Sequence, residues 1–176
     1  MNGHPGGEAH TRRMLELARL SPGARILDLG AGAGETVALL RALGFRAEGI
    51  DLAPRSPLVA RGDLLHSAYP DGSFDAVISQ CAFFVSGNQP DALREACRLL
   101  RPGGKLLLSD LFFDDPAALL RAAGFALLCA EELTPLWREY YFDALWRGDA
   151  PCCEVPRGKS SYWLLIAQKE EQNGSL

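Results

Sequence analysis

A glycine-rich loop separates a short apolar run from a helical pattern near the start of the chain. The apolar run is Arg25–Leu29, the loop is Gly30–Gly34 (GAGAG), and the helical pattern spans Glu35–Leu43 until Gly44 ends it. Glycine lets the backbone approach a ligand closely, and the first turn of a helix offers free N–H groups. A strand, a glycine loop and a helix in this order predict a site for a nucleotide-like ligand.

Further strand-like runs and helical patterns continue along the chain. The sequence predicts additional strands at Arg46–Ile50, Leu58–Arg61, Phe74–Ser79, Lys105–Ser109, Phe125–Ala130 and Ser161–Ala167. It predicts additional helices at Glu8–Leu20, Gln89–Leu100, Pro116–Ala123 and Pro135–Trp146. No helix fits between the second and third strands, because Pro54 and Pro57 fall there. This alternation predicts an α/β fold with a doubly wound, mainly parallel, seven-stranded sheet.

Polar side chains follow several of these strands. Asp28, Asp51, Asp63 and Gln80 all fall at or near the carboxyl end of a predicted strand. In doubly wound sheets that edge holds the ligand. Asp51 lies 51 − 30 = 21 residues after Gly30, where dinucleotide-binding folds also place an acid that holds ribose hydroxyls. The position of Asp51 therefore indicates a ribose without naming the ligand.

The charges beside the loop narrow the choice of ligand. The loop is G-x-G-x-G, which differs from the G-x-G-x-x-G of dinucleotide binders. Asp28 and Glu35 would place a carboxylate at each end of a pyrophosphate, whereas the same charges would favour an ammonium and a sulfonium. S-adenosylmethionine fits this description better than NAD, so an NAD-linked oxidoreductase is the weaker alternative.

Five sequence blocks resemble one known family. In chain order they are Ile26–Gly34, Gly49–Leu52, Arg61–Leu64, Pro70–Val77 and Leu99–Leu106. They resemble motifs of the class I S-adenosylmethionine-dependent methyltransferases, in the small-molecule branch that includes the quinone-biosynthesis methyltransferases. The resemblance spans roughly residues 24–110. It implies a Rossmann-like fold and methyl transfer by in-line displacement to a small-molecule acceptor, with S-adenosylhomocysteine as the product.

The resemblance also implies a role for each matching residue. Asp28 would lie near the methionine ammonium, Asp51 would bind the ribose hydroxyls, and Asp63 would accept a hydrogen bond from the adenine amino group. Leu52 and Leu64 would flank the adenine, the loop would pack against methionine and ribose, and the end of the fourth strand would line the methyl-donor end. The implied cofactor-binding residues are Asp28, Gly30, Ala31, Gly32, Gly34, Asp51, Leu52, Asp63, Leu64, Gln80 and Cys81.

The chain departs from this family pattern in two places. Without a helix after Asp51, one side of the adenine pocket is either more open or covered by a second subunit, as in a homodimer. The segment after the fifth strand is short, so a substrate cap is missing there. His4–Gly7 is interpreted either as a lid over the cofactor or as a disordered tail.

The acceptor side is less specific, because methyl transfer needs no universal catalytic residue. The weak catalytic candidates are His66, Tyr140 and Tyr141. Phe83–Phe84 follow the fourth strand, where the acceptor would enter. Trp137 and Trp146 would form an aromatic wall with the two tyrosines, or would simply pack in the core. Arg138 and Arg147 are either partners of an acidic substrate or solvated charges.

Cys129, Cys152 and Cys153 could act as thiolates on a soft acceptor, but they do not have the spacing found in arsenic methyltransferases. No metal site is predicted.

Composition limits the remaining classes. The chain has 176 residues and a net charge of 18 − 22 = −4, with a pI near 5.4, which argues against nucleic-acid and membrane binding. Ser79–Ala82 stands where nucleic-acid amino-methyltransferases carry their Asn/Asp-Pro-Pro-aromatic signature. Five cysteines without a C-x-x-C pair predict a reduced, cytoplasmic protein.

The sequence is interpreted as one domain, residues 1–176. It divides into an N-terminal helix and lid (1–23), a cofactor-binding core (24–110), a C-terminal sheet and acceptor side (111–169) and a tail (170–176). The alternative function is a methyltransferase-like scaffold that binds the cofactor with little or no turnover.

Overall fold

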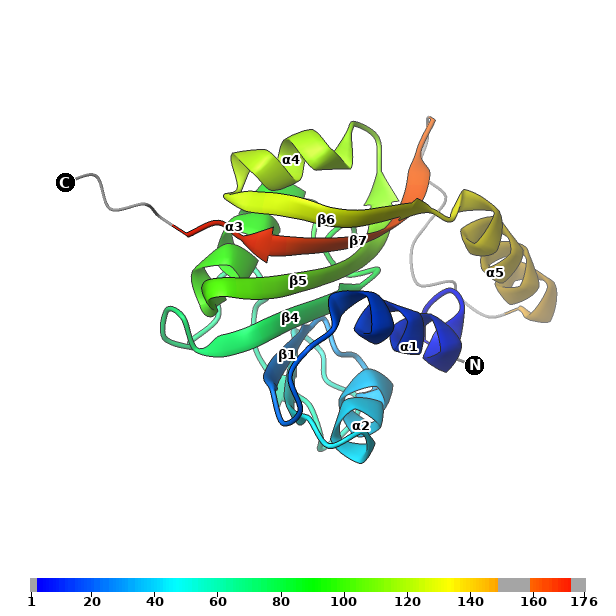
Figure 1. Ribbon diagram of the computed structural model, residues 1–176. Coiled ribbons are helices and arrows are strands. Elements are labelled where there is room, and N and C mark those ends of the chain that lie inside the picture. Colours follow the sequence, from blue (N-terminus) through cyan, green and yellow to red (C-terminus); the bar gives the residue numbers. More distant parts are fainter. Residues whose placement is uncertain (1–2, 149–158, 172–176) are drawn as a thin grey trace.

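A computed structural model describes residues 3–148 and 159–171, and its central feature is a seven-stranded sheet with helices on both faces (Figure 1). The strands are β1 (Arg25–Leu29), β2 (Arg46–Asp51), β3 (Ala60–Arg61), β4 (Phe74–Gln80), β5 (Leu100–Phe112), β6 (Phe125–Glu132) and β7 (Ser161–Lys169). The helices are α1 (Gly7–Ala18), α2 (Glu35–Ala42), α3 (Gln89–Leu99), α4 (Pro116–Ala122) and α5 (Thr134–Arg147). The predicted α/β class and the absence of a helix between β2 and β3 are both confirmed.

The strand order is β3-β2-β1-β4-β5-β7-β6. All neighbouring pairs from β3 to β5 are parallel, whereas β7 runs antiparallel to both β5 and β6. The chain starts in the middle with β1, moves outward to β3 and then returns past β1 to β4. This reversal places the carboxyl ends of β1, β2 and β4 around one crevice, as doubly wound sheets do.

Two strands differ from their predicted lengths. β3 contains only Ala60–Arg61, so Leu58 and Val59 stay outside the ladder. β5 begins at Leu100, because the predicted turn Arg101–Gly104 is absorbed as a bulge between the pairs Phe74–Leu100 and Ala76–Lys105. A bulge accommodates extra residues in one strand without ending its pairing.

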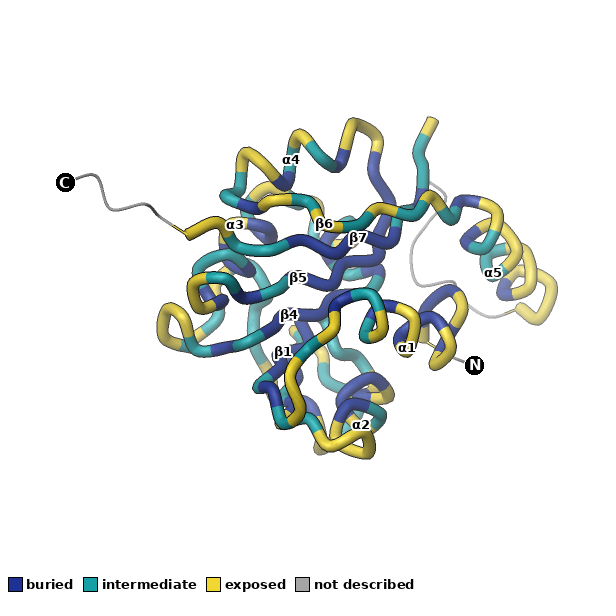
Figure 2. Tube along the Cα trace, in the orientation of Figure 1, coloured by how far each residue is buried: buried dark blue, intermediate teal, exposed yellow. Residues whose placement is uncertain are grey.

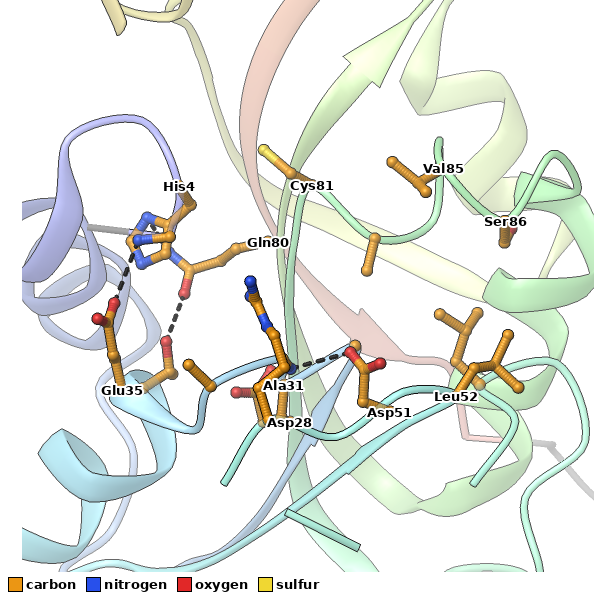
Figure 3. A pocket seen from close by; sticks show the side chains of 18 of the residues that line it. His4, Asp28, Ala31, Glu35, Asp51, Leu52, Gln80, Cys81, Val85 and Ser86 are labelled. Carbon is orange, nitrogen blue, oxygen red and sulfur yellow. Dashed lines mark hydrogen bonds between the residues drawn. The ribbon is translucent and has the colours of Figure 1, made fainter. Parts of the chain in front are cut away.

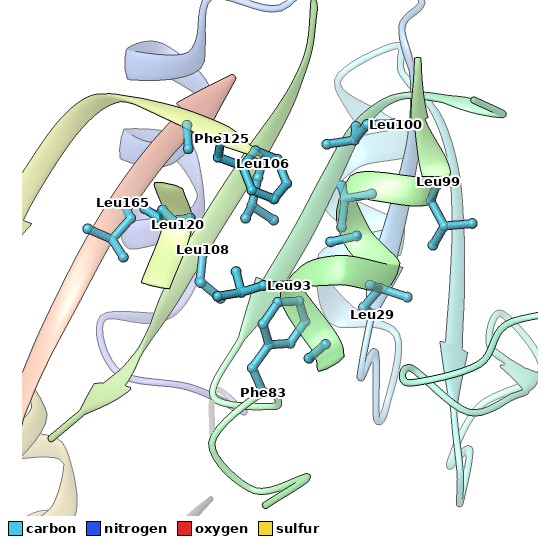
Figure 4. Packing of buried hydrophobic residues seen from close by; sticks show 14 of the residues in the cluster. Leu29, Phe83, Leu93, Leu99, Leu100, Leu106, Leu108, Leu120, Phe125 and Leu165 are labelled. Carbon is cyan, nitrogen blue, oxygen red and sulfur yellow. The ribbon is translucent and has the colours of Figure 1, made fainter. Parts of the chain in front are cut away.

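Apolar side chains fill both faces of the sheet. Figure 4 shows the layer under α3 and α4, where Leu93, Leu99 and Leu120 pack against strand residues such as Leu106 and Leu108. On the other face, α1 and α2 contribute a second cluster of buried side chains, namely Met14, Ala18, Val37 and Leu40. Buried positions therefore concentrate along the strands in the middle of the molecule, and helix surfaces turn outward (Figure 2).

Helix α5 does not carry the predicted continuous aromatic wall. Trp137 is buried beneath the helix, and the Tyr141 ring stacks on it at a centroid distance of 5.4 Å. Trp146 is 92% exposed and points away from that face, since nine residues separate it from Trp137. Phe83, predicted to face the acceptor, is fully buried in the core beside α3. Helical spacing alone did not separate core positions from exposed ones.

None of the helices in residues 3–148 and 159–171 combines the length and the apolar character that crossing a membrane requires.

Candidate functional site

A cavity of about 730 Å³ opens where β1, β2 and β4 end (Figure 3). Its wall includes every residue predicted to bind the cofactor except Gly34, which is the N-cap of α2 and donates its N–H to the Ala31 carbonyl. Two groups of side chains mark the ends of the cavity in Figure 3. One end holds His4, Glu35 and Gln80, and the other holds Leu52, Val85 and Ser86.

The glycine loop forms the floor of this cavity. The N–H groups of Gly30 and Ala31 both donate to the Ile50 carbonyl, at 2.9 and 3.0 Å, which ties the loop to β2. Gly30 has a φ of +86°, and a Cβ there would lie 2.2 Å from the Cβ of Ala82. Only glycine fits this position, because a side chain would meet both steric strain and the chain that follows β4.

Asp51 lies at the end of β2 and faces the loop. Its Oδ2 accepts a hydrogen bond from the Gly32 N–H at 2.9 Å, and its Oδ1 accepts one from the Ala53 N–H at 2.8 Å. These two bonds fix the orientation of a half-buried carboxylate at the cavity wall. Leu52, the next residue, is 63% exposed and presents an apolar surface to the same cavity.

Asp28 lies beneath the loop and is only 3% exposed. Burial, and secondarily the negative charge of Asp51, raise the pKa of Asp28 to about 7. A cationic group bound in the cavity would favour the ionised form of Asp28. The site therefore holds a carboxyl group whose charge responds to its ligand.

The raised pKa of Asp28 makes stability depend on pH. In the unfolded chain this carboxyl ionises near pH 4, whereas in the folded protein it ionises near pH 7. Its contribution to stability is therefore lost as pH rises through that range. We expect Asp28→Asn to increase the free energy of unfolding at pH 8 by roughly 1–3 kcal/mol, with a smaller gain at pH 5.

Urea unfolding of both proteins at pH 5 and pH 8 measures this effect. Asp110 retains part of the pH dependence in the variant, because burial also raises its pKa to about 7. An equal gain at the two pH values, or a loss at pH 8, contradicts the linkage assigned to Asp28.

A hydrogen-bonded group surrounds Gln80 at the other end of the cavity. The Thr36 hydroxyl donates to the Gln80 Oε1 at 3.1 Å, and the Gln80 Nε2 lies 3.2 Å from the Thr11 Oγ1 and 3.3 Å from the His4 Nδ1. Helices α1 and α2, strand β4 and the segment before α1 therefore meet at one amide. This geometry connects His4 to the cavity wall.

Cys81 follows Gln80 in a strained conformation. Its φ of +58° is uncommon for a residue other than glycine, and its N–H donates to the Ser109 carbonyl at 2.8 Å. The thiol is buried at the cavity wall and lies 3.6 Å from the Tyr162 hydroxyl. The bend after β4 thus aims the following residues, including Ala82, across the glycine loop.

The structure adds residues that the sequence interpretation did not assign to cofactor binding. Arg55 crosses the loop, because a Cβ on Gly32 would lie 2.9 Å from its Nη2. The Arg55 N–H also donates to the Gly32 carbonyl at 3.0 Å. The sequence signal that could have identified Arg55 is its position in the segment that replaces the missing helix, directly after Asp51 and Leu52. The other added wall residues are Gly3, Thr36, Gly62, Leu65, Ala82, Val85 and Ser86. The wall also contains His4, Ala33 and Glu35, which the sequence interpretation had linked to the cofactor as part of a lid, part of the loop and a charge beside it.

The three catalytic candidates lie in different places. Tyr140 lines the cavity, whereas Tyr141 stacks on Trp137 and lies outside the wall. His66 is exposed and also lies outside the wall, with its N–H donating to the Asp63 carbonyl at 3.3 Å. The structure therefore brings only Tyr140 to the cavity.

The candidate thiolate and charged positions are not gathered at the cavity. Cys129 lies half-buried on β6, and Cys152 and Cys153 lie outside the described residues. Arg138 is exposed, and Arg147 pairs with Asp143 at 3.7 Å. Within the described part of the chain, no cluster of histidine, cysteine or carboxylate side chains could hold a metal ion.

The charges of the wall show which ligand the cavity suits. Four acidic side chains line the cavity, namely Asp28, Glu35, Asp51 and Asp63. Arg55 is the one arginine among the wall residues of the described chain. A pyrophosphate would meet repulsion from most of these groups. An ammonium, a sulfonium and ribose hydroxyls would each meet a suitable carboxylate, so the residues present fit S-adenosylmethionine.

Comparisons with known proteins agree with this fit. Residues 27–108 match a family model described as "Methyltransferase domain". The chain is 32% identical over 120 residues to an arsenite methyltransferase from Aquipseudomonas alcaligenes, covering 54% of this chain and 35% of that protein. It is 36% identical over 143 residues to a ubiquinone biosynthesis O-methyltransferase from Xanthomonas axonopodis pv. citri, and this match covers 72% of this chain and 59% of that protein.

A solved structure shares the fold at low identity. It is phosphoethanolamine N-methyltransferase 2 from Haemonchus contortus in complex with S-adenosyl-L-methionine, with a TM-score of 0.75 and 16% identity over 96% of this chain and 54% of that chain. The chain spans only 35% and 59% of the lengths of the two curated relatives above. These comparisons therefore bear on the fold and on the shared core.

Proposed function

We propose that this chain, which belongs to the class I S-adenosylmethionine-dependent methyltransferases of the small-molecule type, binds S-adenosylmethionine and transfers its methyl group to a small-molecule acceptor. The observation that carries the proposal is the cavity at the ends of β1, β2 and β4. There Asp51, Asp28 and the glycine loop converge in one wall rich in carboxylates.

Each part of the cavity suits one part of the cofactor. Asp51, whose two oxygens are held by backbone N–H groups, would accept further hydrogen bonds from the two ribose hydroxyls, while Asp63 and the apolar surface of Leu52 would suit the adenine. Asp28 and Glu35 would stabilise positive charge at the methionine end. When bound, the cofactor supplies an electrophilic methyl group on a sulfonium, which leaves as the neutral thioether of S-adenosylhomocysteine.

The protein's own contribution to transfer is alignment and exclusion of water. Gln80, fixed by Thr11, Thr36 and His4, and the buried Cys81 form a rigid wall near the proposed methyl-donor end. Holding two reactants in a productive geometry is a major source of rate enhancement in such displacements.

A small-molecule acceptor is supported by the family. A cytoplasmic location and a homodimer that covers the adenine side stay predictions.

Thermal unfolding with three ligands tests cofactor binding. We expect S-adenosylmethionine and S-adenosylhomocysteine at ~100 times their dissociation constants to stabilise the protein by ~2.7 kcal/mol each, because they bind only the folded state. For a domain of this size that is an increase in Tm of roughly 5–10 °C. NADH at the same concentration is expected to leave the Tm unchanged.

The controls separate binding from turnover. A shift with NADH alone would contradict the cofactor assignment. A shift with both sulfur ligands, followed by no methyl transfer to any acceptor in a broad screen, would favour the scaffold alternative over catalysis.

A further inference from the structure

A second cavity of about 480 Å³ lies beside the cofactor cavity, lined by residues at the start of α1 and on helix α5. Its wall consists of His4, Gly6, Gly7, Tyr140, Asp143, Ala144 and Arg147. His4 and Tyr140 line both cavities. A molecule in the second cavity would therefore approach the cofactor past these two side chains.

We propose that the second cavity binds the methyl acceptor, and that the imidazole of His4 accepts the proton of an acidic hydroxyl on that acceptor. This inference rests on the proposed function, because the hydroxyl oxygen must face a methyl donor in the first cavity. The volume of the second cavity lies within the range of ordinary small-ligand sites.

The surroundings of His4 hold its ring in place. The side chain is 8% exposed, its Nε2 lies 3.4 Å from the Thr11 Oγ1, and its Nδ1 lies 3.3 Å from the Gln80 Nε2 and 3.2 Å from the Pro5 carbonyl. The preceding residue is anchored as well, since the Gly3 N–H donates to the Glu35 Oε2 at 3.1 Å. Figure 3 shows His4 above Gln80, close to the end of β4. A base fixed at the wall can meet a proton in a defined place.

The charges around His4 suit a neutral base. Burial lowers the pKa of His4 below its ordinary value, whereas the charge of Glu35 on α2 raises it. His10 on α1 faces His4 at a ring distance of 6.2 Å, and burial, followed by the charge of His4, lowers its own pKa to about 4. From α5, Tyr140, Asp143 and Arg147 face the second cavity. His4 is therefore uncharged at neutral pH, and Glu35 would stabilise the imidazolium that forms.

The chemistry of a neutral imidazole selects the acceptor class. A free amine attacks without losing a proton first, and an aliphatic hydroxyl gives its proton to an imidazole only while the attack is under way, as a catalytic serine does. A phenolic or enolic hydroxyl lies between these limits. Its O–H bond breaks, the electron pair stays on oxygen, and a new N–H bond forms at Nε2 of the imidazole, because Nδ1 faces the Pro5 carbonyl and carries the ring hydrogen of the neutral form. The imidazolium later returns the proton to water.

A coloured phenol tests this step without requiring turnover. The probe is 4-nitrocatechol, whose absorption spectrum distinguishes the phenol from the phenolate, added to protein saturated with S-adenosylhomocysteine. We expect the pKa of the bound probe to be lower in the wild type than in His4→Gln by about one unit or more. One unit is a tenfold change in the ionisation equilibrium. With S-adenosylmethionine and a less acidic catechol, we expect His4→Gln to lower kcat/KM by ~10²–10⁴-fold.

Controls separate the role of His4 from a loss of folding. His66→Gln is a matched change at an exposed histidine outside the cavity wall, and it should behave as the wild type. His66→Gln should bind S-adenosylhomocysteine with wild-type affinity. His4 also lines the cofactor cavity, so His4→Gln is compared with the wild type only after each protein has been saturated with S-adenosylhomocysteine.

The other results overturn specific parts of the proposal. Equal ionisation of the probe in the wild type and His4→Gln removes the proton-acceptor role. Failure of the wild type to bind the probe while it binds S-adenosylhomocysteine removes the acceptor assignment. Failure to bind S-adenosylhomocysteine at all instead contradicts the proposed function on which both depend.

Discussion

Asp51→Ala is expected to weaken the binding of S-adenosylhomocysteine by roughly 10²-fold, or about 3 kcal/mol. The carboxylate would lose its hydrogen bonds with the ribose hydroxyls, and bonds to a charged group contribute about 1.5–3 kcal/mol each. The variant also loses the acceptor for the Gly32 and Ala53 N–H groups, so the loop is held less firmly. Isothermal titration calorimetry measures the affinity, and most of the ligand-induced increase in Tm should disappear as well.

Asp114→Ala is the matched control, because it removes an exposed carboxylate that lies away from the cavity wall. Its affinity for S-adenosylhomocysteine should equal that of the wild type. Wild-type affinity in Asp51→Ala would show that the carboxylate at the end of β2 does not hold the ribose, and the proposed placement of the cofactor would then be wrong.

Gly30→Ala is expected to destabilise the protein by about 2–4 kcal/mol. Two costs add here: the left-handed backbone costs roughly 1–2 kcal/mol for a residue with a Cβ, and overpacking typically costs 1–3 kcal/mol more. The clash is severe, because the new Cβ would lie 2.2 Å from the Ala82 Cβ. Urea unfolding gives the difference in the free energy of unfolding.

Two further variants separate these costs. Gly23→Ala carries the same kind of backbone cost, with a φ of +71°, but a Cβ there would meet no atom within 4 Å. Gly23→Ala should therefore lower the free energy of unfolding by the backbone cost alone, which is smaller than the loss expected for Gly30→Ala. Adding Ala82→Gly to Gly30→Ala removes the clashing methyl group and should restore the steric part. A loss in Gly23→Ala as large as that in Gly30→Ala would contradict the close approach between the loop and the segment after β4.

Local sequence rules were sufficient for the sheet, and they located about half of the residues that line the first cavity. Apolar runs bounded by turn residues predicted each strand, and Pro54 and Pro57 correctly excluded a helix after β2. The positions of Asp28 and Asp51 followed from the rule that ligands bind at the carboxyl ends of parallel strands. These predictions depend on neighbours in sequence, which one chain displays directly.

The acceptor side and the rest of the cofactor-cavity wall depend on contacts between distant segments. His4 reaches Gln80 across 76 residues, and Arg55 reaches the glycine loop from a segment without regular structure. No periodicity marks such contacts. The same limit explains Phe83 and Trp146, because the burial of an aromatic side chain is decided by the element packed against it.

The two-residue strand β3 has a consequence for how copies of this protein can associate. A long edge strand exposes a row of unpaired N–H and C=O groups, which can template pairing with another chain. Here the ladder between β2 and β3 contains only the pairs Ile50–Ala60 and Asp51–Arg61. A second copy therefore finds almost no backbone ladder to extend at this edge. A dimer formed on this side would have to be held by side chains such as the exposed Leu52 and Leu58, and it would be sensitive to their substitution rather than to backbone pairing.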